Sequence, residues 1–184
     1  LGNFITNNML IFMTGSIFGS IMGDTGAAQD IAHSMTGVID KLNVKNKKFV
    51  ALMVLTLVCM VLNYGGISGY VIVFTMVPIC KRVFKKYDIA WHLYLVVHSF
   101  GSLVTQAMLP GTPAIQNLIP MEYLGTTPTA APWLGTATAI IFCVPVATLY
   151  SWYALRQTVK KGEGFMVTGA GINETILEED KQGG

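Results

Sequence analysis

The chain has 184 residues, of which 52% are hydrophobic and only 12% are charged, and its mean hydropathy is +0.54. Soluble domains carry about 25% charged residues, and here the charges are clustered, which leaves apolar runs of the ~20 residues that a helix needs to cross a bilayer. This pattern excludes an ordinary soluble domain and indicates an integral membrane protein, while the net charge of +2 decides little. The three cysteines, Cys59, Cys80 and Cys143, are widely spaced within apolar runs, so we interpret them as packing residues. Because the chain lacks an initiator Met and opens close to an apolar helix, we interpret it as a piece of a longer protein.

The first predicted span covers residues 4–22, and Gly15, Gly19 and Gly23 recur at every fourth residue. This spacing places the glycines on one helix face, which favours close helix packing over a role in ligand binding. Asp24 follows the span directly. It is either an interfacial acid or helix cap, or an ionisable group that carries a coupling proton.

The segment from Ala28 to Leu42 is too polar to span a membrane, yet its apolar residues recur on one helical face. These residues are Ile31, Met35, Val38, Ile39 and Leu42. The pattern predicts an amphipathic helix that lies in the membrane interface, with His33 facing water.

Two basic clusters flank the apolar run from Phe49 to Cys80, and both mark a cytoplasmic surface by the positive-inside rule. They consist of Lys41, Lys45, Lys47 and Lys48 before the run, and of Lys81, Arg82, Lys85 and Lys86 after it. Because one crossing helix would put the clusters on opposite sides, we predict a re-entrant helical hairpin over residues 49–80. Its arms, Phe49–Leu62 and Tyr70–Ile79, each match roughly half a bilayer, so the glycine-rich tip at residues 63–69 would lie near the midplane. Two full but short spans are the alternative.

A broken helix is predicted over residues 89–121, because the run from Ile89 to Leu109 leads into the stretch Leu109–Pro120. This stretch carries three prolines, a glycine and two side-chain amides. Proline removes amide donors and glycine relaxes φ, so the helix must break. A broken backbone among apolar helices lines something polar, which makes this stretch the candidate binding site. Its depth is left open between the midplane and the far membrane face.

His98 is a polar residue within the apolar run that precedes the break. Either it forms a hydrogen bond to a neighbouring helix, which we favour, or it carries a coupling proton.

The last predicted span covers residues 132–154, with a kink at Pro145. Arg156, Lys160 and Lys161 return the chain to the cytoplasm. The sequence therefore predicts a transmembrane repeat over residues 1–156 and a cytoplasmic linker or tail over residues 157–184.

Three motifs resemble the gluconate permease family, which belongs to the ion transporter superfamily of secondary carriers. They are the run Asn63-Tyr64-Gly65-Gly66-Ile67-Ser68, the block Leu109-Pro110-Gly111-Thr112-Pro113-x-x-Gln116-Asn117-x-Ile119-Pro120, and the run Gly125-Thr126-Thr127-x-x-Ala130-Ala131-Pro132-x-Leu134-Gly135. The segment from Ile17 to Ala32 fits the same family. The resemblance covers roughly residues 10–155, and the proline-glycine block is its most specific part.

The resemblance implies an all-α transporter of two inverted repeats, a gluconate:proton symporter or a relative that moves another small carboxylate. This chain would be about one repeat, with the hairpin tip and the broken helix facing each other at the substrate site. The implied tip residues are Asn63, Gly65, Gly66 and Ser68, and the implied residues of the opposite wall are Thr112, Gln116, Asn117 and Thr126. His98 and Asp24 are the candidates for proton coupling. His98 stands where a less polar residue is expected, so Na⁺ remains an alternative to H⁺.

The expected partners are a small organic anion, the lipid bilayer of a prokaryotic inner membrane, the missing second repeat and a second copy in a homodimer. We expect no cofactor, no metal site and no nucleic acid. A channel is the first alternative function, although the sequence has no recognisable selectivity filter or ring of acids. An intramembrane enzyme is the second, although His98 and Asp24 are its only ionisable candidates. We therefore expect a transporter and not an enzyme.

Overall fold

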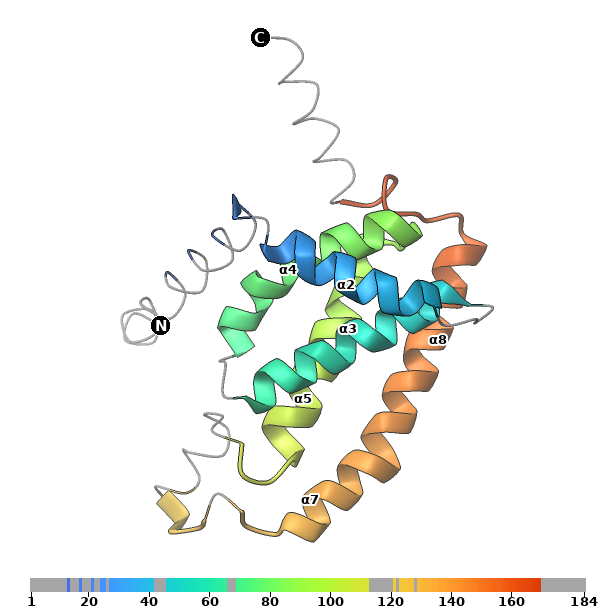
Figure 1. The fold of residues 1–184 in the computed structure, drawn as a ribbon. Coiled ribbons are helices and arrows are strands. Elements are labelled where there is room, and N and C mark those ends of the chain that lie inside the picture. Colours follow the sequence, from blue (N-terminus) through green and yellow to red (C-terminus); the bar gives the residue numbers. More distant parts are fainter. Residues whose placement is uncertain are drawn as a thin grey trace, which may run out of the picture.

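The computed structural model describes residues 27–41, 46–65, 69–112, 123–127 and 129–169, together with residues 13, 17, 21, 24, 25 and 121. In this part of the chain every regular element is a helix, as the sequence predicts (Figure 1). Apart from residues 13, 17 and 21, the predicted first span with its glycines lies outside the described residues.

Helix α2 (Ala27–Lys41) lies across α3 and α4 (Figure 1). Met35 and Ile39 are buried, as their place on the predicted apolar face requires, but Ile31 and Val38 are exposed. The helix therefore packs through a narrower face than its amphipathic pattern predicts. His33 is exposed, as expected.

Helices α3 (Lys47–Tyr64) and α4 (Gly69–Tyr87) form an antiparallel pair, with the tip at one end and the two basic clusters at the other (Figure 1). Asn46 caps α3, since its side-chain oxygen accepts a hydrogen bond from the backbone N–H of Phe49 (3.4 Å). At 18 and 19 residues both helices are longer than the predicted half-bilayer arms, and α3 alone is long and apolar enough to cross a membrane. The predicted arm lengths are therefore wrong.

The end of α4 explains much of this difference. Lysine and arginine are good helix formers, and neither glycine nor proline follows Ile79, so the helix continues through the basic cluster. It ends at Tyr87, and the next residue, Asp88, takes a left-handed φ of 48°. The backbone N–H of Ile89 then donates to the carbonyl of Phe84 (2.9 Å), the bond that closes a helix in a Schellman motif.

Helix α5 (Tyr94–Met108) follows the short 3₁₀ turn η1 (Trp91–Leu93) and packs closely along α3. Gly101 permits this approach, because a Cβ atom there would lie 2.6 Å from Sγ of Cys59. Cys59 and Cys80 are buried free thiols, in agreement with their interpretation as packing residues. The core between α3, α4 and α5 includes Leu52, Leu55, Cys59, Ile72, Met76, Cys80 and Val97.

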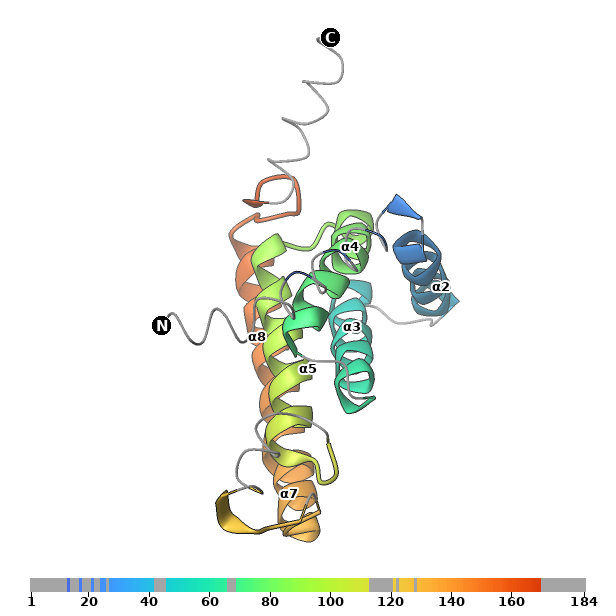
Figure 2. The ribbon, with the colours of Figure 1, turned by 90° about the vertical axis from the view of Figure 1, so that its left-hand side faces the viewer.

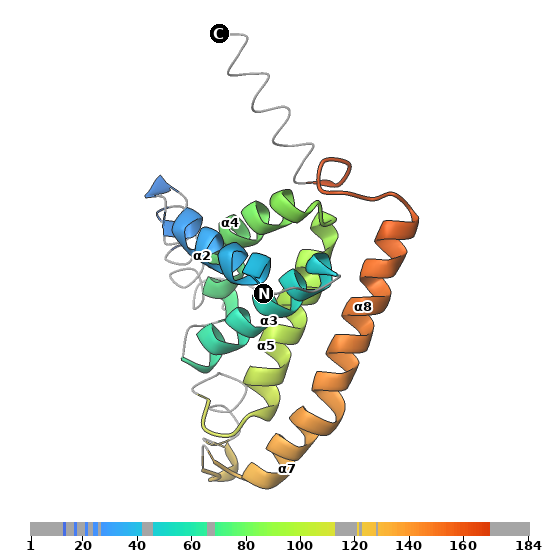
Figure 3. The ribbon, with the colours of Figure 1, turned by 45° about the vertical axis from the view of Figure 1, so that its right-hand side comes forward.

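The last three helical segments follow one another without a gap. They are α7 (Pro132–Thr138), the π-helical segment η2 (Ala139–Cys143) and α8 (Val144–Lys160). The π turn lies directly before Pro145, the predicted kink. Because Pro145 has no N–H to donate, the ladder shifts, and the N–H of Val144 reaches back five residues to the carbonyl of Ala139. The whole 29-residue stretch is apolar enough to cross a membrane. Only 17% of the residues in its most apolar part are buried, so it lies at the edge of the bundle (Figures 2 and 3).

The described part of the predicted tail is packed against the end of α4. Phe165 is 1% exposed, and its N–H donates to Oδ1 of Asp88 (2.9 Å). The hydroxyl of Thr168 accepts a hydrogen bond from the N–H of Trp91 (2.8 Å). The chain after α8 therefore returns to the end of the α3–α4 pair opposite the tip, which we call the base of the pair.

Candidate functional site

Gln106 connects the two places where the helices are interrupted. It lies in the last turn of α5, and its Nε2 donates a hydrogen bond to Oδ1 of Asn63 (2.5 Å) at the end of α3. The same amide lies against Gly69, the first residue of α4, where a Cβ atom would come within 2.5 Å of Nε2. The hairpin tip and the end of α5 thus share one polar side chain.

Asn63 is almost fully buried at 3% exposure, and its amide group is hydrogen-bonded. Nδ2 donates to the carbonyl oxygen of Cys59 (3.0 Å) and to Oγ of Ser102 (3.2 Å), while Oδ1 accepts from Gln106. A buried amide without these partners would be costly in apolar surroundings, so the three side chains hold one another in place.

Ser102 and Gln106 are not among the residues singled out from the sequence, although a signal for them was present. His98, Ser102 and Gln106 follow one another at intervals of four within an apolar run. Residues four apart share a helix face, so this spacing marks a polar stripe along α5 that leads to the tip. The predicted site was based on the proline-glycine block and did not include this stripe.

The break after α5 begins where the prolines predict it. The helix ends at Met108, and Leu109 is extended, as the steric demand of the following Pro110 requires. Gly111 has a left-handed φ of 78°, and buried Thr112 donates from its hydroxyl to the carbonyl of Leu109 (3.4 Å).

Helix α7 packs directly on the end of α5. A Cβ atom on Gly135 would lie 2.2 Å from the carbonyl oxygen of Met108, so only glycine fits at this contact. One of the last carbonyls of α5 is therefore covered by the helix that follows the break.

The predicted site residues fall into three groups. Asn63, Gly65 and Thr112 lie at the tip or the break, although Gly65 is exposed and serves as the C-cap of α3. Thr126 is exposed in the segment before α7. The remaining four lie outside the described residues: Gly66, Ser68, Gln116 and Asn117.

The two proton-coupling candidates differ in their surroundings. Asp24 is exposed shortly before α2. His98 is half-buried on α5, where its ring stacks on Tyr94 with 6.3 Å between ring centroids. Its Nδ1 atom is buried, and no hydrogen-bond partner for it occurs within the described part of the chain.

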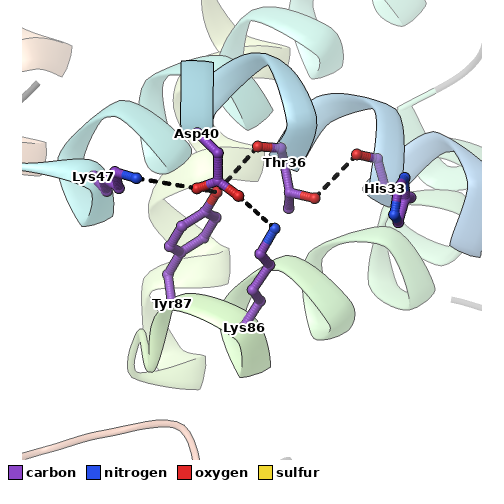
Figure 4. A network of polar contacts seen from close by, with 6 residues as sticks. All are labelled: His33, Thr36, Asp40, Lys47, Lys86 and Tyr87. Carbon is purple, nitrogen blue, oxygen red and sulfur yellow. Dashed lines mark hydrogen bonds and ion pairs between the residues drawn. The ribbon is translucent and has the colours of Figure 1, made fainter. Parts of the chain in front are cut away.

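An ionic network at the opposite end of α3 and α4 brings the basic clusters together (Figure 4). Asp40 of α2 binds Lys86 at 2.7 Å and Lys47 at 3.3 Å, and its Oδ1 also accepts from the hydroxyl of Tyr87 (3.0 Å). These bonds, that of Lys86 first, lower the pKa of Asp40 to about 2. Desolvation and then the bond to Asp40 raise the pKa of Tyr87 to about 12. Since one carboxylate binds the start of α3 and the end of α4, both ends lie on the same side of the molecule.

Comparison with known proteins gives two matches. Residues 1–170 match the GntP family permeases. The chain is also 31% identical, over 166 residues, to the uncharacterized transporter YxjC of Bacillus subtilis (strain 168). The match covers 90% of this chain and 34% of that protein, so the chain spans about one third of the length of this relative. No solved structure matches.

The family match covers all of the described residues, including the tip, the end of α5 and the helix at 132–160 that is apolar enough to cross a membrane. The sequence motifs and the all-helical membrane architecture agree with it. The chain therefore belongs to the GntP permease family, the gluconate permease family that its motifs resemble.

Proposed function

We propose that this chain forms about one repeat of a secondary active transporter for a small organic anion, gluconate or a related carboxylate, driven by a coupled cation. The observation that carries the proposal is the contact of Gln106 with both Asn63 and Gly69. Through it, two interruptions of the backbone that are far apart in sequence meet at one polar site within an apolar bundle. Membrane transporters place their substrate and ion sites at such interrupted helices.

The ends of the helices supply complementary partial charges at this site. Helix α4 begins at Gly69, and the N-terminus of a helix carries partial positive charge that suits a carboxylate. Helix α5 ends at Met108, and the carbonyls freed there by Pro110 suit a cation. Gln116 and Asn117, close behind the break in sequence, are proposed as the substrate-binding amides of the opposite wall, with Thr112 and Thr126.

The position of the tip relative to α7 favours a re-entrant hairpin over two full spans. At ~1.5 Å per residue the stretch from Pro132 to Lys160 is about 43 Å long, which exceeds the ~30 Å hydrocarbon core. Helix α7 extends beyond the tip of the α3–α4 pair (Figures 1 and 3). If the start of α7 lies at the far membrane face, the tip stops part of the way through the bilayer. The shared carboxylate of Asp40 places both ends of the pair on one side, as a re-entrant hairpin and two full spans both require.

We propose H⁺ as the coupling ion, with Na⁺ as the alternative. His98 is the proton-carrier candidate to be tested first, because it lies on the polar stripe of α5 and its Nδ1 is buried. Asp24 is the second candidate. The complete carrier would add the second inverted repeat and form a homodimer in a prokaryotic inner membrane.

Transport by the full-length protein in proteoliposomes tests the proposal. Counterflow with a panel of sugar acids, hydroxy acids and short fatty acids identifies the substrate. Uptake driven by a pH gradient should collapse with an uncoupler, whereas a channel would continue to conduct the anion down its gradient.

A single substitution tests whether Asn117 belongs to the substrate site. We expect Asn117→Leu to abolish uptake without loss of membrane insertion, because the amide contacts substrate. The matched control is Thr138→Val, since the hydroxyl of Thr138 bonds to the carbonyl of Leu134 in its own helix (2.7 Å). Normal uptake by Asn117→Leu would remove this residue from the site.

A further inference from the structure

A second concave site lies at the base of the molecule, away from the proposed transport site. A cavity of about 970 Å³ opens between the base of the α3–α4 pair and the last turns of α8. Five cationic side chains are among the residues that line it: Lys47, Lys48, Lys86, Arg156 and Lys160.

The carboxylates nearby do not balance these cations. Lys47 and Lys86 share Asp40, and Lys48 binds the backbone oxygen of Asp88 at 2.6 Å and its carboxylate at 3.4 Å. Among the described residues five cations thus face two carboxylates, which gives this part of the site a net positive charge.

The two cations contributed by α8 are available to a ligand. Within the described residues neither Arg156 nor Lys160 forms an ion pair, and the guanidinium group of Arg156 lies over the ring of Trp152, 4.1 Å from its centroid. A guanidinium group over an aromatic ring still has N–H groups to donate, and these suit a phosphate. The first turn of α3, beside Lys47 and Lys48, adds the positive end of a helix dipole.

The apolar wall of the cavity indicates what kind of phosphate fits. Leu155 and Val159 line it beside the cations, and Val159 is 57% exposed. From Val159 an exposed apolar face continues along α8 and η2. It includes Trp152, Leu149 and Phe142, whose spacing of three and seven residues places them on one helix face. A free phosphate would leave this face unused, whereas the acyl chains of a lipid would lie along it.

We propose that this cavity binds the headgroup of an anionic phospholipid of the cytoplasmic leaflet. The basic clusters place the cavity on the cytoplasmic side, where the leaflet carries negative charge and basic pockets between transmembrane helices bind anionic headgroups. The phosphate lies between Arg156 and Lys160 on one side and the base of the α3–α4 pair on the other. The lipid holds α8 against the pair at the level of the interface.

The test measures retention of phosphatidylglycerol by the delipidated full-length protein, using native mass spectrometry during titration with this lipid or with phosphatidylcholine. The double variant Arg156→Gln/Lys160→Gln should bind phosphatidylglycerol roughly thirtyfold more weakly, at about 1 kcal/mol for each cation removed. The control Lys41→Gln/Lys161→Gln removes the same charge from exposed positions near the cavity and should change binding less than about twofold. Equal losses in both double variants, or equal retention of phosphatidylcholine, would overturn the proposal.

A second measurement does not depend on the folding of the double variant. A cysteine at Val159, in a background without native cysteines, should be protected from maleimide by phosphatidylglycerol but not by phosphatidylcholine. Millimolar inorganic phosphate should not reproduce this protection. If phosphate alone protects the cysteine as well as the lipid does, the cavity is a free-anion site and the lipid assignment fails.

Discussion

Nε2 of Gln106 lies 2.5 Å from Oδ1 of Asn63, so a hydrogen bond between two side-chain amides joins the last turn of α5 to the end of α3. The residues are 43 positions apart in sequence, and each lies next to an interruption of its helix. The bond therefore fixes the distance between the two halves of the proposed site and gives a direct way to test it.

The first prediction concerns this amide pair. Asn63→Leu and Gln106→Leu should each abolish uptake, because each removes the hydrogen bond that joins the end of α3 to the end of α5. A double-mutant cycle on the unfolding free energy of the full-length protein should give a coupling of about 0.6–1.7 kcal/mol, the range of interhelical hydrogen bonds in membranes. Thr75→Val is the matched control, since buried Thr75 bonds to the carbonyl of Val71 in its own helix (2.9 Å). A coupling of zero would show that the pair does not hold the site together.

The second prediction concerns His98. We expect a structural role, because its ring stacks on Tyr94. His98→Phe should retain the stacking, and with it both uptake and substrate exchange, while His98→Ala should lower both activities together. The measurement compares uptake driven by a pH gradient with counterflow in the same proteoliposomes. If His98→Ala keeps counterflow but loses the response to the gradient, the residue carries the coupling proton.

The third prediction concerns the carboxylate that joins α2 to the base of the α3–α4 pair. Asp40→Asn should lower the unfolding temperature of the full-length protein at neutral pH, because Lys47 and Lys86 lose their shared partner. The pKa of Asp40 falls from 3.8 to about 2 on folding, so its stabilising effect is complete above about pH 4 and is lost as the pH falls through 2.

The difference in unfolding temperature between wild type and Asp40→Asn should therefore stay constant from pH 7 to about 4 and then disappear. Asp30→Asn makes the same charge change in the same helix and serves as the control, because Asp30 lies in the first turn, away from the network. A wild-type advantage that persists at pH 2 would contradict the assignment.

The sequence predicted the helical class, the end of α5 and the disturbed backbone near Pro145, because proline and apolar run length act locally. It failed for the arms of the hairpin, since the basic residues after Ile79 were interpreted as the end of a membrane segment although they are good helix formers. The helix instead ends at Tyr87, before Asp88, whose left-handed conformation is supported by a hydrogen bond from Phe165, 77 positions away. No local pattern reveals such a contact.

The same limit applies to the candidate site. The resemblance to the gluconate permease family singled out Asn63 as a residue of the tip. It did not give Ser102 and Gln106 as partners of Asn63, because which face of α5 meets α3 depends on the close approach at Gly101. Periodicity marks a face but does not say what that face contacts.

The last prediction tests the topology on which the site depends. Lys47 and Lys86 bind the same carboxylate, so the two ends of the α3–α4 pair must face one side of the membrane. Single cysteines at Asn46 and Lys85, in a full-length background whose native cysteines are replaced by alanine, should both react with a membrane-impermeant maleimide from the cytoplasm. A cysteine at Tyr123, which is 81% exposed in the segment before α7, should react only from outside and provides the reference.

A cysteine at Ser68 should react slowly and be protected by substrate, because we expect the tip to lie within the transport site. If the Asn46 and Lys85 positions react from opposite sides, or if the cysteine at Ser68 reacts readily from outside as two full spans require, α3 and α4 do not form a re-entrant pair, and the tip loses its claim to the substrate.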